Sequence, residues 1–175
     1  MIYIKTYLTV ICFLFSTILL GQHELNPNNS LYIELFGNGE GLLSVNYERK
    51  TGKLFNSSNY TRIGYSINEN IFDSSLVHLF PLESNIIFGN KKHHLETGIG
   101  VTFIKGTSDF SSSIIPNDYK TNFDFRLFMR FGYRLIEIDG LVIRASPLIV
   151  FYREKPLINK FNTYWTIGLS FGYAW

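Results

Sequence analysis

Large apolar residues alternate with small or polar ones along the last stretch of the chain, Tyr164 to Trp175. One register is large and apolar or amphipathic throughout: Trp165, Ile167, Leu169, Phe171, Tyr173 and Trp175. The other register is small or polar after its first residue: Tyr164, Thr166, Gly168, Ser170, Gly172 and Ala174. Because a β-strand sends successive side chains to opposite faces, this pattern predicts a strand with one apolar face. Its length suits a tilted strand that crosses a bilayer, which needs about 9–11 residues.

The same alternation recurs along the chain and predicts about eight strands. They are expected at Ser30–Phe36, Leu42–Arg49, Asn59–Ile67, Ser75–Phe88, His94–Ile104, Asn122–Leu135, Leu141–Tyr152 and Tyr164–Trp175. In Asn122–Leu135 every second residue from Phe123 onward is large and apolar. Ser75–Phe88 is the least regular, and its Pro81 predicts a bulge or a local break because proline cannot donate to a β-ladder. Pairing of Tyr164–Trp175 with Ser30–Phe36 would remove both sheet edges.

The connections between these strands differ in length in a regular way. Gly37–Gly41 and Asp139-Gly140 carry turn signals, and Lys50–Ser58 is expected to be a connection rich in Lys, Ser and Gly. The longest connection is Lys105–Thr121, and Arg153–Thr163 is a basic, exposed loop. Long loops at one end and mostly short ones at the other are typical of outer-membrane barrels, whose long loops are extracellular.

The first residues have the pattern of a secretory signal peptide. Lys5 precedes an apolar run from Tyr7 to Leu20, and cleavage is expected after Gly21. An uncleaved anchor helix is the alternative, but the run is shorter than the roughly 20 residues that a spanning helix needs. The predicted organisation is therefore a signal peptide at 1–21, a periplasmic lead-in at 22–29 and a barrel domain at 30–175.

Composition narrows the class of protein. The formal net charge is +2 and the sequence pI is near 8.6, which argues against a nucleic-acid footprint. Aromatic residues make up 17% of the chain and charged residues only 17%, which suits a protein that faces lipid. The single cysteine, Cys12, lies in the expected signal peptide, so a mature chain would have no disulfide and no thiol chemistry.

With these patterns, the chain resembles the small outer-membrane β-barrel proteins of Gram-negative bacteria. The resemblance covers roughly Ser30 to Trp175 and rests on the alternating strands, on the segment from Gly89 to Gly100 and on the ending Gly-Leu-Ser-Phe-Gly-Tyr-Ala-Trp. It implies an all-β, antiparallel, up-and-down transmembrane barrel of about eight strands. It also implies insertion by a barrel-assembly machine that reads the terminal strand, with Phe171, Tyr173 and Trp175 as assembly signal and aromatic girdle.

The expected inward faces carry charges of both signs on neighbouring strands. These residues are Glu34, Glu48, Arg62, Glu96, Asp124, Arg126, Arg130, Arg134 and Arg144. The interior of an eight-stranded barrel is just wide enough for side chains to fill, and an unpaired buried charge is very costly. An ion-paired plug is therefore the first interpretation. A narrow charge-lined pore is the second, because the inward glycines leave room for water or long side chains: Gly98, Gly100, Gly168 and Gly172.

Candidate chemistry elsewhere in the chain is weak. His93 and His94 could suggest a metal site, but neighbouring residues in a strand point to opposite faces and cannot easily chelate one ion. Ser111–Ser113 and Asp109 share the long loop, yet no histidine lies close to them in sequence. We therefore expect no catalytic site, metal or cofactor.

The sequence thus predicts a small, monomeric, non-enzymatic barrel in the cell outer membrane. Its expected role is structural, or binding of an extracellular ligand through Lys105–Thr121 and Arg153–Thr163. A narrow pore for ions or small solutes is the alternative, and a membrane enzyme is a distant third. Outer-membrane lipid and the barrel-assembly machinery are the expected partners, and nucleic acid is not.

Overall fold

The computed structural model describes residues 27–38, 43–54, 57–69, 76–89, 92–107, 121–153 and 161–175. The predicted signal peptide, most of the predicted lead-in and the central parts of both long predicted loops lie outside these ranges. No helix among the described residues is long and apolar enough to span a membrane.

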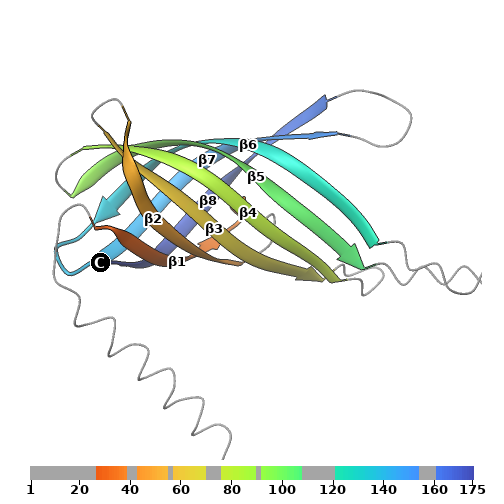
Figure 1. The fold of residues 1–175 in the computed structure, drawn as a ribbon, viewed down its shortest axis with the longest axis horizontal. Coiled ribbons are helices and arrows are strands. Elements are labelled where there is room, and N and C mark those ends of the chain that lie inside the picture. Colours follow the sequence, from red (N-terminus) through yellow and green to blue (C-terminus); the bar gives the residue numbers. More distant parts are fainter. Residues whose placement is uncertain are drawn as a thin grey trace, which may run out of the picture.

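The described residues form eight antiparallel strands that close into a barrel (Figure 1). The strands are β1 (Asn29–Leu35), β2 (Ser44–Leu54), β3 (Ser57–Glu69), β4 (Leu76–Phe88), β5 (His93–Thr107), β6 (Thr121–Ile136), β7 (Leu141–Arg153) and β8 (Phe161–Ala174). Each strand pairs with its neighbour in sequence, and β1 pairs with β8 from Ser30↔Ala174 to Leu35↔Leu169. The predicted all-β barrel, including its closing pair of strands, is confirmed.

The two ends of the barrel are distinct. At one end of the barrel the start of β1 meets the last residue of the chain: the Asn29 and Trp175 backbones exchange two hydrogen bonds of 2.9 Å there. We call it the terminus end, and we call the opposite end, which borders residues 39–42, 70–75, 108–120 and 154–160, the loop end. The hairpins at the terminus end are short, because β2 ends at Leu54 and β3 begins at Ser57. The predicted loop Lys50–Ser58 is therefore wrong: most of it continues the strands, which pair across a register shift between Lys50 and Gly52.

Side chains alternate between the lumen and the outer face as the sequence pattern predicts. In β8, Leu169 and Phe171 are exposed on the outer face, while Ser170 and Ala174 are buried. Most outward positions of the other strands are also apolar, and together they form an apolar surface. Its members on the three strands with the clearest pattern are Leu95, Ile99 and Phe103 on β5; Phe123, Phe125, Leu127, Met129 and Phe131 on β6; and Trp165, Ile167, Leu169 and Phe171 on β8. The hydrophobic face of this barrel is thus its exterior.

Two prolines interrupt the ladders without shifting the register. The pairing of β3 with β4 keeps one register on both sides of Pro81, but Gly64 and Tyr65 of β3 have no ladder partner on β4. Pro147 leaves a similar gap opposite Phe131 and Gly132 between β6 and β7. Each proline still pairs on its other side, so only the ladder that needed its missing N–H is broken. Pro81 therefore causes the local break that the sequence predicts, and no bulge.

The β1–β2 connection departs from the simple hairpin turn expected at Gly37–Gly41. Phe36 has the same strand register as the inward Glu34, but it has a φ of 55° and is 50% exposed. This left-handed residue ends β1 early and directs Gly37 and Asn38 into the barrel, where both are buried. Gly37 and Asn38 of the connection therefore lie inside the lumen.

Closure at the β1–β8 seam requires a residue without a side chain at position 172. A Cβ built on Gly172 would lie 2.2 Å from the Leu31 carbonyl oxygen and 2.5 Å from the Tyr32 Cα, and backbone atoms cannot easily move away. We expect Gly172→Val to lower the free energy of unfolding in detergent by about 3 kcal/mol, as severe overpacking does. Gly106→Val on β5, where nothing lies within 4 Å of the added Cβ, is the matched control and should change it by less than about 0.5 kcal/mol. Equal losses in urea titrations of the two variants would contradict this explanation.

Candidate functional site

Two glutamates and two arginines form a closed ring of ion pairs midway along the lumen. Glu34 of β1 contacts Arg62 of β3 and, at 2.7 Å, Arg130 of β6. Glu83 of β4 contacts the same two arginines, Arg62 at 2.8 Å and Arg130 at 2.7 Å. Each carboxylate uses one oxygen for each guanidinium, so the four groups alternate in charge around the ring. We call it the loop-side ring, because it lies nearer the loop end.

A second ring follows towards the terminus end. Glu96 of β5 contacts Arg134 of β6 at 2.9 Å and Arg144 of β7 at 2.6 Å. Glu48 of β2 contacts Arg134 at 2.9 Å and Arg144 at 3.5 Å, and Ser146 donates a hydrogen bond of 2.8 Å to Glu96. We call this the terminus-side ring. Like the first ring it contains two positive and two negative groups, so both are electrically neutral.

Tyr32 of β1 joins the two rings. Its hydroxyl donates to Glu48 at 2.9 Å and accepts a hydrogen bond from Arg144. Its aromatic face lies 5.2 Å from the Arg62 guanidinium of the loop-side ring and 5.0 Å from that of Arg144. Cations near an aromatic face are stabilised by the ring quadrupole, more so when water is excluded. The rings and Tyr32 therefore form one continuous network.

The β1–β2 connection covers the loop-side ring. The Asn38 amide donates to Glu83 at 3.0 Å and its carbonyl oxygen accepts from Arg62 at 2.8 Å. Its backbone carbonyl accepts from the Thr102 hydroxyl of β5 at 2.8 Å, and that of Phe36 accepts from Thr166 of β8 at 2.8 Å. We call residues 36–38 the strap, since they are held by strands on different sides of the lumen. The strap seals the network towards the loop end.

Burial makes pairing in this network obligatory. All eight charged side chains of the two rings are at most 3% exposed. Moving an isolated charge into such an interior costs several kcal/mol even after relaxation, so each group depends on its partners. The side chains also fill the cross-section of the lumen, as expected for a barrel of this strand number. The two rings therefore place a network of paired charges with no net charge across the lumen.

The structure does not bring all the charged candidates together. Eight residues enter the rings, and seven of these are among the candidates predicted from the sequence. Asp124 and Arg126 lie closer to the loop end and are only half-buried; the Arg126 guanidinium donates to the Tyr164 hydroxyl at 3.3 Å and lies 5.7 Å from the Tyr152 ring. Both residues are part of the barrel wall between the loop-side ring and the loop end.

Sequence reasoning missed Glu83, which completes the loop-side ring. The alternation of β4 is mixed, because Leu79 and Ile87 face the lumen together with Glu83 while Ser84 faces outward. Counting back from the apolar Phe88 in steps of two puts Ser84 and Leu82 outside and Glu83 inside. That count would have found the residue.

The two adjacent histidines lie on opposite faces of β5. His94 is buried in the lumen, whereas His93 is exposed and its ring lies beside that of Tyr133 on β6. Among the described residues, no group of three or more His, Cys, Asp or Glu could hold a metal ion.

The ring geometry predicts that removing one arginine leaves a buried, uncompensated negative charge. Arg130→Ala should lower the free energy of unfolding in detergent by about 3–5 kcal/mol. Arg126→Ala is the matched control on the same strand and face, and it should cost less than about 1 kcal/mol because the side chain is half-buried and outside the rings. Adding Glu83→Gln to Arg130→Ala should recover part of the loss, which a double-mutant cycle measures. Equal losses for Arg130→Ala and Arg126→Ala would contradict the obligatory pairing.

Comparison with known proteins agrees with this architecture. No protein-family model matches the chain, and no curated protein matches it. Among solved structures, it is similar to the crystal structure of the N-terminal β-barrel domain of Pseudomonas aeruginosa OprF, with a TM-score of 0.56 and 12% sequence identity over 88% of this chain and 100% of that domain. At this identity the likeness shows the fold alone. The chain therefore has the fold of an eight-stranded outer-membrane β-barrel, which confirms the architecture that its sequence resemblance implies.

Proposed function

We propose that this protein is a monomeric, non-enzymatic barrel of the cell outer membrane whose lumen is closed. Its role would be structural, or binding through the loops at the loop end. The observation that carries the proposal is the pair of neutral ion-pair rings that fills the lumen of a barrel with an apolar exterior.

The outer face supports the membrane placement. On β6, outward apolar residues run from Phe123 to Tyr133, about ten residues that span about 25 Å along the bilayer normal at a strand tilt of about 40°. This matches the height of about 25 Å of the apolar band in outer-membrane barrels. Amphipathic rings lie near both borders: Tyr65 bonds His78 at 2.8 Å near the loop end, and Tyr173 stacks on Trp175 at the terminus end. Such rings suit the interface between lipid and water.

The orientation follows from the same placement. In barrels of this kind the short turns are periplasmic and the long loops extracellular. The terminus end, with its short β2–β3, β4–β5 and β6–β7 hairpins, would then face the periplasm. Lys105–Thr121 and Arg153–Thr163 would reach the cell exterior, where a ligand could bind.

The closed lumen favours a structural or binding role over conduction. A solute would have to separate charges in both rings, because each ring crosses the lumen and the strap covers one of them. The narrow pore remains the alternative function, and conduction would require a rearrangement of both rings.

Conductance distinguishes these two functions. The folded protein in a planar lipid bilayer should show no steady single-channel current, because both rings block the lumen. Asn38→Ala should stay equally silent, since it weakens the strap and leaves both rings in place. Reproducible ohmic steps from the unaltered protein would refute the closed lumen and establish the pore.

The closing strand generates a second prediction, for assembly. Phe171 and Trp175 are exposed on the outer face, and the Trp175 backbone is hydrogen-bonded to Asn29. We propose that the barrel-assembly machinery reads this apolar face. Deleting Tyr173 to Trp175 should leave secretion intact but strand the chain in the periplasm, where it is degraded. Exchanging the inward residues Ser170 and Ala174 is the control and should change the amount in outer-membrane fractions little. Normal insertion of the truncated chain would exclude this role.

A further inference from the structure

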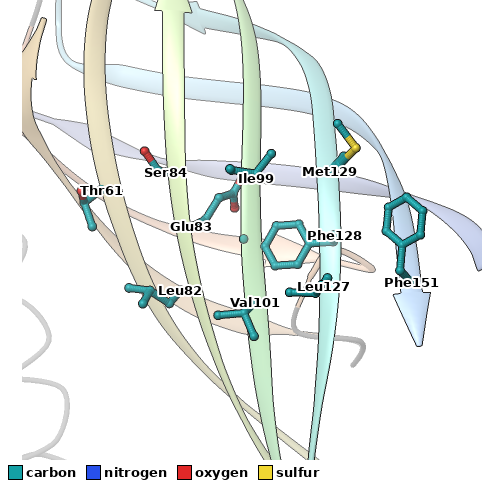
Figure 2. Close-up of a pocket in the computed structure, with 11 residues that line it drawn as sticks. Thr61, Leu82, Glu83, Ser84, Ile99, Val101, Leu127, Phe128, Met129 and Phe151 are labelled. Atoms are coloured by element: carbon teal, nitrogen blue, oxygen red, sulfur yellow. The ribbon is translucent and has the colours of Figure 1, made fainter. Parts of the chain in front are cut away.

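A groove crosses the outer face of the barrel from β3 to β7. It has a volume of about 620 Å³. Figure 2 shows its two walls, one formed by Ser84, Ile99 and Met129 and the other by Leu82, Val101 and Leu127. These wall residues are cross-strand neighbours, so the walls are parallel rows across the sheet. Between them, the backbone row from Glu83 through Gly100 to Phe128 forms the floor.

The groove is inclined to the membrane. It begins near Thr61, close to the terminus end of β3, and ends near Phe151, close to the loop end of β7. Four strand spacings separate β3 from β7, which is about 19 Å at about 4.8 Å per spacing. With strands tilted by about 40°, such a row climbs about 12 Å along the normal, which is less than half of the hydrocarbon core of about 30 Å. On β6 the groove reaches Phe128, the middle of the apolar band from Phe123 to Tyr133.

At Thr61, the end of the groove nearer the terminus end, the groove meets a group of polar side chains that we call the ledge. Thr51, Asn59, Thr61 and Ser84 occupy outward positions on β2, β3 and β4, where the rest of the outer face is mostly apolar. They bond one another: Ser84 donates to Asn59 at 3.2 Å, Asn59 to Thr51 at 3.1 Å and Thr61 to Thr51 at 3.3 Å. Polar groups are costly in hydrocarbon, so this ledge belongs at the depth of the lipid headgroups.

A positive charge lies beside the ledge. Arg49 is exposed and pairs in register with Thr61, so the two side chains share the outer face. Glu48, the acidic residue beside Arg49 in sequence, points into the lumen and is held by Arg134 and Arg144. A phosphate group is the natural partner of a guanidinium beside hydroxyl and amide donors.

We propose that the ledge and groove bind one glycerophospholipid with a negatively charged headgroup from the leaflet at the terminus end. Its phosphate contacts Arg49 and the ledge, and one acyl chain lies in the groove between the two walls. Length, inclination, apolar walls and the charge beside the ledge all match this ligand. The site rests on the membrane placement proposed above and adds to it a specific lipid position.

Native mass spectrometry of the folded protein in detergent, titrated with dioleoyl phosphatidylglycerol, tests the site. The unaltered protein should retain one lipid. Arg49→Gln, which removes the charge, and Val101→Phe, which fills the groove from its wall, should each lower the retained fraction at least fivefold. The matched controls are Lys105→Gln at the loop end and Val45→Phe on β2, both at exposed positions outside the groove, and they should stay within twofold. Ile99→Phe replaces Val101→Phe if that variant does not fold.

The remaining outcomes overturn the site. Equal retention by all variants would mean unspecific annular lipid, and a loss with Arg49→Gln alone would mean a headgroup contact without an acyl chain in the groove. Equal retention of dioleoyl phosphatidylcholine would exclude recognition of charge. Failure of the membrane placement itself would look different, because the barrel would then stay monomeric in buffer without detergent.

Discussion

The pairing of buried charges is the constraint on which the rest of this structure depends. A barrel that exposes its apolar residues to lipid must fill its interior with the polar half of each strand, and here that half contains four arginines and four glutamates in the two described rings. Each carboxylate bridges two guanidiniums and each guanidinium contacts two carboxylates, so every charge in the rings has two partners of opposite sign. The rings therefore connect β1, β2, β3, β4, β5, β6 and β7 through the lumen, in addition to the ladders that connect them around the wall.

This requirement explains the irregular features of the wall. β1 is the shortest strand of the described barrel, and its early end at Phe36 lets Asn38 reach the loop-side ring. Gly98 and Gly132 leave room for lumen side chains: an added Cβ would lie 2.0 Å from the Asn85 amide oxygen at one position and 2.1 Å from the Ser146 hydroxyl at the other. These two glycines on the inner face thus give the side chains of Asn85 and Ser146 their space.

The exterior follows a different rule, because in the proposed placement lipid is its solvent. Apolar residues cover most of it, and the polar exceptions are hydrogen-bonded to one another or lie near the ends. Tyr65 with His78 and His93 with Tyr133 are both outward-facing pairs of this kind. The ledge at Thr51 and Asn59 is a further exception. It lies at the end of the groove nearer the terminus end, so one end of the groove is polar and the rest is apolar.

The sequence by itself determined the class of fold, the number of strands and which face of most strands is apolar, because a strand's period of two is visible in the residues without any tertiary information. It also identified most of the lumen charges, Arg62 and Arg130 among them. Only the tertiary structure decided which charges meet: Glu34 and Arg130 are far apart in sequence, and their contact depends on the shear and closure of the barrel. The mixed pattern of β4 hid Glu83, and the positive φ of Phe36 placed Asn38 in the lumen. The need to pair buried charges decided these features. That need arises only when the barrel closes and removes the charges from water, so it cannot be seen in the residues of a single strand.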